Sequence, residues 1–303
     1  MLAIYFVRNL KMVILVKNNQ HILVIGSSGM LGNAVTRYFF LDPEFVITGT
    51  VRSKESIAFF PEQVRDNIVW GVDVDNFGTV ADVIKQQKPD IVINCVGLVK
   101  QLSDANDPLV ALPINSLFPH RLARCCAEHD ARLIHMSTDC VFNGSKGGYL
   151  DDDIPDAQDL YGVSKRLGEV NYPNAVTLRT SIIGHELNGS RSLIDWFLSQ
   201  EGSVKGFSEA IFSGLPTVEI ARIIRDYVIP NKELCGVYHV SADSINKYDL
   251  LNLVANIYGH QIEIKKDKYL KIDRSLNSSR FRAATGFNPA PWDEMITTMR
   301  DFG

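Results

Sequence analysis

The sequence predicts an α/β protein whose core is a doubly wound parallel sheet, followed by a smaller C-terminal lobe. Four short apolar runs alternate with segments of helical periodicity, which is the rhythm of βαβ units. They are residues 21–25, 45–51, 68–74 and 89–97. A glycine-spaced turn follows the first run directly. Two later runs, residues 176–181 and 236–240, are expected to add strands to the same sheet.

Composition limits the classes of function. A chain of 303 residues with 46% apolar content can form one large globular unit or two lobes. The net charge of −4 and the lack of a basic run argue against a nucleic-acid partner. The five cysteines show no C-x-x-C spacing and the seven histidines form no H-x-x-x-H pair. We therefore expect no metal site and a reducing, cytoplasmic location.

The first 20 residues form a segment of their own. Arg8 and Lys11 interrupt its apolar stretches, unlike the unbroken run of a secretory signal. We expect an extension that carries no function. Apolar runs elsewhere are too short to cross a bilayer, so no membrane partner is expected.

The turn after the first strand reads GSSGMLG at residues 26–32, a G-x-x-G-x-x-G pattern between a strand and a helix. Glycines in this context let backbone amides and the helix N-terminus approach a pyrophosphate. The turn therefore predicts a Rossmann-type dinucleotide site. The contacts expected from it are Gly26, Ser28, Gly29, Met30 and Leu31.

The exit of the second strand bears on which dinucleotide binds. NAD sites usually place Asp or Glu near this point to hold the ribose diol, whereas arginine suits a 2′-phosphate. Arg52 follows the strand and no acid comes before Glu55, so the sequence favours NADPH over NAD. A solvated basic loop is the alternative.

Two further strand exits are expected to line the same cofactor. Asp73 and Val74 end the third strand, where a carboxylate can accept from the adenine amine and valine can pack on the ring. A solvated turn is an equal alternative for Asp73. The fourth strand ends in Cys95, Val96 and Gly97, small residues that let the backbone approach the cofactor.

Residues 133–169 carry the strongest catalytic signal. A short apolar strand leads to Thr138, and a later helix carries Tyr161 and Lys165 four residues apart. This spacing puts the phenol and the amine on one helical face. The carboxyl end of such a strand is where open α/β sheets bind ligands.

The trio suits proton transfer to a carbonyl. A free tyrosine has a pKa of about 10, so a neighbouring ammonium such as Lys165, together with a nicotinium ring, is expected to lower it. Thr138 would hydrogen-bond the carbonyl oxygen as charge develops, while Tyr161 protonates it. Asn115, on a helical segment, is expected to brace backbone nearby. The Y-x-x-x-K spacing often occurs by chance on amphipathic helices. It therefore supports a catalytic role only together with the dinucleotide site.

Together these motifs resemble those of the extended short-chain dehydrogenases/reductases and, more narrowly, of the dTDP-4-dehydrorhamnose reductase (RmlD-like) family. The resemblance covers roughly residues 21–300. Its carriers are GSSGMLG, the Asp73–Val74 pair, PDIVINCVG, Asn115, STDCVF, YGVSKRLGE, LRTSIIG and SGLPTVEIA. The resemblance implies that Thr138, Tyr161 and Lys165 act in reduction of the C4 ketone of a deoxysugar nucleotide.

One position departs from the family pattern. Reductases for rhamnose typically read S-T-D-Y-V-F, whereas the fourth position here is Cys140. Related 4,6-dehydratases carry glutamate there, so dehydration is disfavoured. GDP-fucose synthases, which epimerise before reducing, carry a cysteine two residues after the catalytic hydroxyl, as Cys140 follows Thr138. A thiol of lowered pKa could shuttle a proton there, and a small packing residue is the alternative.

The remaining candidates belong to the substrate side. The strand over residues 176–181 ends in Ser181, a further cofactor contact, and its exit over residues 182–185 is expected beside the nicotinamide. Arg274 suits a diphosphate and Trp196 a base, with surface exposure or core packing as the alternatives. The substrate-binding candidates are Asp139, Cys140, His185, Trp196 and Arg274.

The sequence thus predicts a cytoplasmic, NADPH-dependent reductase of a 4-keto-6-deoxy sugar nucleotide, of the dTDP or the UDP-2-acetamido series, for surface polysaccharide synthesis. A C3/C5 epimerase or epimerase-reductase using Cys140 is one alternative. A non-catalytic NAD(P)-binding regulator, similar to the regulatory subunit of methionine adenosyltransferase, is the other. The expected division is an extension (1–20), an NAD(P)-binding domain (21–180, with 216–242 returning to it) and a substrate-binding lobe (181–303). A homodimer is one possibility.

Overall fold

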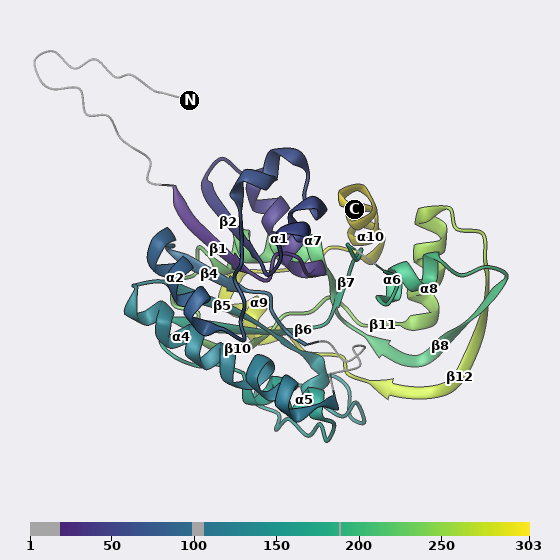
Figure 1. Ribbon diagram of the computed structural model, residues 1–303. Coiled ribbons are helices and arrows are strands. Elements are labelled where there is room, and N and C mark those ends of the chain that lie inside the picture. The colour runs from purple at the N-terminus through teal and green to yellow at the C-terminus, as the bar shows by residue number, and fades with distance from the viewer. Residues whose placement is uncertain (1–18, 99–105, 188) are drawn as a thin grey trace, which may run out of the picture.

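The computed structural model describes residues 19–98, 106–187 and 189–303, and its centre is a seven-stranded parallel sheet (Figure 1). The strand order is β10-β6-β5-β4-β1-β2-β3, so the chain reverses direction across the sheet between β1 and β4. The strands are β1 (Gln20–Ile25), β2 (Phe45–Val51), β3 (Ile68–Trp70), β4 (Ile91–Asn94), β5 (Arg132–Thr138), β6 (Ala175–Thr180) and β10 (Gly236–His239). This is the doubly wound α/β fold expected from the sequence.

Helices cover both faces of the sheet because β1, β4, β5 and β6 are apolar on both sides (Figure 1). Val35 of α1 and Ile220 of α7 are buried on one face, and Val80 of α2 and Leu122 of α4 on the other. The helices of this layer structure are α1 (Met30–Phe40), α2 (Phe77–Gln87), α3 (Pro108–Ala111), α4 (Phe118–Glu128), α5 (Leu160–Leu167), α7 (Thr217–Ile223), α9 (Ser279–Thr285) and α10 (Trp292–Phe302).

A smaller lobe lies beside the carboxyl end of the sheet (Figure 1). Its three-stranded sheet has the order β11-β8-β12, and a two-stranded pair joins β7 to β9. Its elements are β7 (Ile182–Ile183), α6 (Leu193–Leu198), β8 (Ser203–Phe212), β9 (Leu215–Pro216), β11 (Ile245–Asn246), α8 (Lys247–Tyr258) and β12 (Glu263–Asp273). Phe281 of α9 and Met295 of α10 pack into the core of the main sheet, which the sequence did not indicate.

Two elements differ from the sequence-based expectation. The third strand stops at Trp70 instead of reaching residue 74, because Gly71 adopts a φ of +84° that ends the extended run. Asp73 and Val74 therefore lie in a turn beyond the strand. The fourth strand, expected over residues 89–97, is β4 over Ile91–Asn94 only. Residues 217–228 form α7 followed by a π-helical turn, η6 (Ile224–Val228).

The remaining short turns are η1 (Lys54–Phe59), η2 (Glu62–Asn67), η4 (Leu112–Leu117) and η5 (Asp139–Val141). Over the described residues, none of the helices combines the length and hydropathy needed to cross a bilayer. The same residues hold no group of three or more His, Cys, Asp or Glu side chains suited to a metal ion.

Truncating Ile220 should measure how strongly α7 holds the sheet. Its side chain is 0% exposed, so Ile220→Ala leaves a cavity and should lower the free energy of unfolding by about 2–5 kcal/mol. Leu41→Ala removes a side chain that is 71% exposed and should change it by less than about 0.5 kcal/mol. Urea denaturation followed by circular dichroism makes the comparison. Equal effects would contradict the packing described.

Candidate active site

The glycine turn is shaped by close contacts between backbone segments. Gly26 has a φ of +85°, and a Cβ there would lie 2.7 Å from the Val96 side chain. A Cβ on Gly32 would collide with the Gly26 carbonyl oxygen. Only glycine fits either position. The turn therefore keeps its backbone bare, which is what close approach of a pyrophosphate requires.

Ser27 ties this turn to β2, a role that the sequence did not indicate. Its Oγ donates to Val24 O at 3.2 Å and accepts from Thr50 N at 3.1 Å and from the Thr36 hydroxyl at 2.9 Å. Among the predicted contacts, Ser28, Gly29 and Met30 are at least partly exposed. The Leu31 side chain packs in the core, so only its backbone can reach a ligand.

The exits of β2 and β3 lie beside this turn. Arg52 is exposed, and its carbonyl oxygen accepts from Gly71 N at 3.2 Å. Asp73 is half-buried and accepts from Asp75 N at 3.1 Å through one carboxylate oxygen. Val74 packs against the core cluster under α2.

Asn115, buried in η4, holds the loop after β4 in place. Its side-chain oxygen accepts from Leu98 N at 2.8 Å, and its amide donates to Leu98 O at 3.2 Å and to Ser164 Oγ at 3.1 Å. The bracing role expected for Asn115 is confirmed by these bonds. They connect Leu98, which directly follows Cys95, Val96 and Gly97, to Ser164 of α5. A Cβ on Gly97 would lie 3.6 Å from Lys165 Nζ.

Thr138, Tyr161 and Lys165 converge at the carboxyl end of β5. The side chains of Thr138 and Tyr161 are close enough for Thr138 to lower the pKa of Tyr161. Thr138 Oγ1 also donates to Asp139 Oδ1 and accepts from Cys140 N, both at 3.1 Å. Lys165 Nζ donates to the carbonyl oxygen of Met136 at 2.8 Å and is only 5% exposed as a residue.

Burial controls the protonation of this cluster. Desolvation, with Cys140 as the next contribution, raises the pKa of Tyr161, while the hydrogen bond from Thr138 lowers it. Desolvation lowers the pKa of Lys165 to about 8. The sequence-based expectation was a Tyr161 pKa lowered by Lys165. In the coenzyme-free structure the removal of water outweighs any such effect, so Tyr161 is a neutral phenol.

The substrate-side candidates Asp139, Cys140 and Arg274 form a second cluster next to the trio. Burial raises the pKa of the Asp139 carboxyl group, which Arg274 opposes. Burial and then Asp139 raise the pKa of the Cys140 thiol to about 12. Arg274 Nε donates to the Phe142 carbonyl at 2.8 Å. Cys140 is therefore a neutral thiol, which does not favour its use as a base.

Lys247 joins this cluster and was missed from the sequence. Burial lowers the pKa of its ammonium group, while Asp139 and Cys140 raise it. It is the first residue of α8 and half-buried. No local motif marks it, because α8 approaches η5 only in the folded chain.

The chain matches the model of the RmlD substrate binding domain over residues 20–301. It belongs to that family. The match confirms an extended short-chain dehydrogenase/reductase of the RmlD type. A curated relative from Haloferax volcanii, named probable low-salt glycan biosynthesis reductase Agl14, is 31% identical over 166 residues. That alignment covers 53% of this chain and 52% of the relative, so the chain spans about half the length of the reductase it matches.

Two further proteins align with more of this chain than the Haloferax volcanii relative does. Methionine adenosyltransferase 2 subunit beta from Xenopus laevis is 24% identical over 291 residues, covering 90% of this chain and 79% of the relative. The solved dTDP-4-dehydrorhamnose reductase of Bacillus anthracis in complex with NADP has a TM-score of 0.75 and 19% identity. It covers 93% of this chain and 98% of that chain, a likeness of fold.

The remaining predicted residues, His185, Trp196 and Ser181, differ in their contacts and their exposure. His185 has both ring nitrogens within 2.8 Å of protein atoms, Asp195 Oδ1 and the Tyr258 hydroxyl, so its ring is engaged within the lobe. Trp196 is 37% exposed on α6. Ser181 is partly exposed, and its carbonyl accepts from Leu215 N at 2.9 Å.

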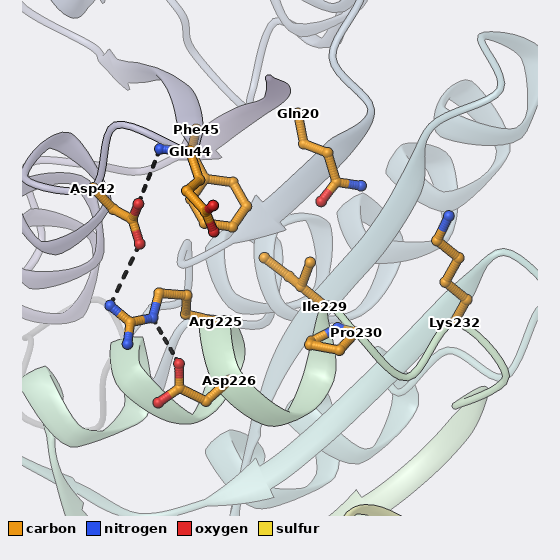
Figure 2. Close-up of a pocket in the computed structure, with 9 residues that line it drawn as sticks. All are labelled: Gln20, Asp42, Glu44, Phe45, Arg225, Asp226, Ile229, Pro230 and Lys232. Carbon is orange, nitrogen blue, oxygen red and sulfur yellow. Dashed lines mark hydrogen bonds and ion pairs between the residues drawn. The ribbon is translucent and has the colours of Figure 1, made fainter. Parts of the chain in front are cut away.

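One pocket of the described residues lies away from this cluster. Figure 2 shows it, about 840 Å³ in volume, at the first residues of β1 and β2, Gln20 and Phe45. Because the strands are parallel, that is the edge opposite to Thr138. Its central charges pair with one another, Arg225 with Asp42 at 3.4 Å and with Asp226 at 2.6 Å.

Alkylation with iodoacetamide should reveal the protonation of Cys140. Its raised pKa leaves little thiolate at pH 8, so it should react at least tenfold more slowly than the exposed Cys235. The ratio of the Cys235 rate to the Cys140 rate should become smaller as pH rises towards 10, because the thiolate fraction of Cys140 is then still growing. Peptide mass mapping measures both rates, with Cys140→Ser to assign the peptide. Equal rates at pH 8 would contradict a neutral thiol.

Proposed function

We propose that the chain is an NADPH-dependent reductase of the C4 ketone of a 4-keto-6-deoxy sugar nucleotide, used in surface polysaccharide synthesis. The observation that carries the proposal is the convergence of Thr138, Tyr161 and Lys165 beside the end of the sheet that bears the bare glycine turn. Family membership supports it, and so does the relative named a glycan biosynthesis reductase.

The residues present fit a nicotinamide dinucleotide. Gly26 and Gly32 let the turn fold tightly, because a Cβ on either would collide with Val96 or with the turn's own backbone. A Cβ on Gly97 would contact Lys165 Nζ at 3.6 Å, so the bare backbone of Gly97 lies next to that ammonium group. Arg52 is exposed at the exit of β2, where a 2′-phosphate would lie. When bound, NADPH would supply hydride to C4 of the sugar.

In the proposed mechanism the protein supplies and holds the proton. The Thr138 and Tyr161 hydroxyl groups both face the ketone oxygen, and Thr138 stabilises the charge that develops on it. Tyr161, a neutral phenol, donates its proton to that oxygen. Lys165, fixed by the Met136 carbonyl, holds the ribose and stabilises the phenolate left on Tyr161.

We assign the substrate's diphosphate to the cationic side of the cluster. Arg274 and Lys247 both lie close enough to Asp139 for electrostatic coupling. Two cations beside one acid leave an excess positive charge, which suits the two negative charges of a nucleoside diphosphate.

A non-catalytic regulatory role is the second candidate. The relatives named methionine adenosyltransferase 2 subunit beta align over 90% of this chain in the Xenopus laevis protein, more than the Haloferax volcanii reductase does. The intact Thr138, Tyr161 and Lys165 set favours catalysis.

Replacing Tyr161 tests the proposed reaction. Tyr161→Phe removes the proton donor and should lower kcat by about 10²–10⁴-fold while NADPH affinity changes less than about threefold. The assay follows NADPH oxidation with a panel of 4-keto sugar nucleotides in the dTDP and UDP series. A kcat of Tyr161→Phe equal to that of the wild-type chain would contradict the proposed mechanism. A wild-type chain that binds NADPH, turns over no member of the panel and captures a methionine adenosyltransferase would favour the regulatory role.

Arg52 tests the choice of coenzyme. Arg52→Ala should reduce the preference for NADPH over NADH, as the ratio of kcat/KM values, by about tenfold or more, because one charge-assisted contact to the 2′-phosphate is lost. Lys85→Ala, on the exposed side of α2, serves as the control. An unchanged ratio in Arg52→Ala would assign the preference elsewhere.

A further inference from the structure

A buried ion pair anchors the end of α5, and the proposed mechanism gives it no role. Glu169 follows the helix and accepts from Arg179 Nε at 2.6 Å and Nη2 at 2.7 Å. The two side chains are 7% and 6% exposed. A bidentate pair this deeply buried holds one geometry, and separating it would leave an uncompensated charge.

The same carboxylate reaches the end of β5. Ser137 Oγ donates to Glu169 Oε1 at 2.7 Å, and Ser137 is opposite Arg179 in the β5–β6 register. Ser137 stands between Met136, whose carbonyl accepts from Lys165 Nζ, and Thr138. Glu169 and Lys165 are four positions apart in the chain. They therefore bind Ser137 and Met136, which are neighbours at the end of β5.

Beyond Arg179 the network continues to His239 and to Asp151, whose carboxylate accepts from His239 N at 2.8 Å. Arg179 Nη1 lies 3.2 Å from His239 Nε2, and His239 Nδ1 lies 3.0 Å from the Tyr149 carbonyl oxygen. Burial and then Arg179 lower the pKa of His239 to about 4. A neutral His239 donates to Tyr149 and accepts from Arg179, so it adds no charge near neutral pH.

The groups facing Lys165 from the packed elements contribute little opposing charge. Burial raises the pKa of Cys95, on the β4 exit, to about 12. Burial and then Lys165 push the pKa of His135, on β5, well below its usual value. Tyr161 is also neutral. Among the described residues, Glu169 contributes most to offsetting the desolvation of the Lys165 ammonium group, ahead of Cys95, and Arg179 partly offsets Glu169.

We propose that Glu169 is a positioning residue of the catalytic trio. Through Ser137 and Arg179 it fixes the end of α5 against the carboxyl end of β5, and its charge keeps Lys165 in the ammonium form near neutral pH. The proposal rests on the proposed function for its catalytic consequence, because that function gives Lys165 its role.

The direction of the expected change follows from the charges. Lys165 has a pKa of about 8, and removing Glu169 removes a contribution that raises it, so the ammonium form is lost at lower pH. A fall of about one pKa unit would reduce the ammonium fraction about fivefold at pH 8 and by less than about 1.2-fold at pH 6. A purely structural role would lower activity by the same factor at both pH values.

Two measurements test the proposal, one without activity. The first titrates Lys165 in the coenzyme-free protein by the ¹³Cε chemical shift of labelled lysine, assigned with Lys165→Arg. The second is the pH profile of kcat/KM. Glu169→Gln should move the Lys165 titration and the alkaline limb down by about one unit or more. Glu169→Asp, which keeps the charge, should restore most of that shift.

Two controls keep the test decisive. Glu169→Gln/Arg179→Gln replaces the ion pair by a neutral pair, so it tests the loss of charge if the single variant unfolds, and it should shift the titration less. Ser137→Ala removes a hydrogen bond but keeps both charges, so it should leave the titration in place. An unchanged Lys165 titration in folded Glu169→Gln or in the double variant would overturn the proposal. If the wild-type chain oxidised no NADPH, the proposed function would fail while the titration still decided the role of Glu169.

Discussion

The burial of one ammonium group is the constraint around which the site is arranged. Lys165 is almost wholly removed from water, and its hydrogen bond to the Met136 carbonyl replaces only part of its hydration. That bond fixes α5 against β5, and Asn115 fixes α5 against the loop after β4. The position of Tyr161 over Thr138 follows from these two attachments. An arrangement that left Lys165 in solvent would release the helix that carries the phenol.

The removal of water from the site also determines which of its side chains carry protons. Tyr161, Cys140 and Asp139 all have raised pKa values, with burial as the first cause in each case. A site of this kind holds its protons until charge develops on a bound ligand. For a reduction, which needs a proton delivered to a nascent alkoxide, that is the useful resting state. Epimerisation would need the opposite, a group ready to remove a proton from carbon.

Sequence reasoning succeeded where the chemistry is local. The glycine turn is contiguous, and Tyr161 and Lys165 are one helical turn apart, so pattern alone brought them to one end of the parallel sheet. It missed Ser27 and Lys247, whose partners are Thr50 and the Asp139 cluster, far away in the chain.

The raised pKa of Tyr161 in the coenzyme-free chain could not be predicted from the motif, for a related reason. Desolvation depends on how many separate segments pack around the phenol, and a motif contains none of that information. His185 shows the same limit, because Asp195 and Tyr258 engage its ring from two other elements. The third strand was predicted too long because an apolar alternation does not reveal that Gly71 turns the backbone.

The edge position of β10 has a consequence for synthesis of the chain. β10 pairs with β6, and the face of the sheet that α1 covers is completed by α7, α9 and α10. While the ribosome has released only the first two hundred or so residues, an unpaired β6 edge and a wide apolar surface stay open to other nascent chains. Until β10 and these helices have been synthesised, that intermediate is exposed to aggregation.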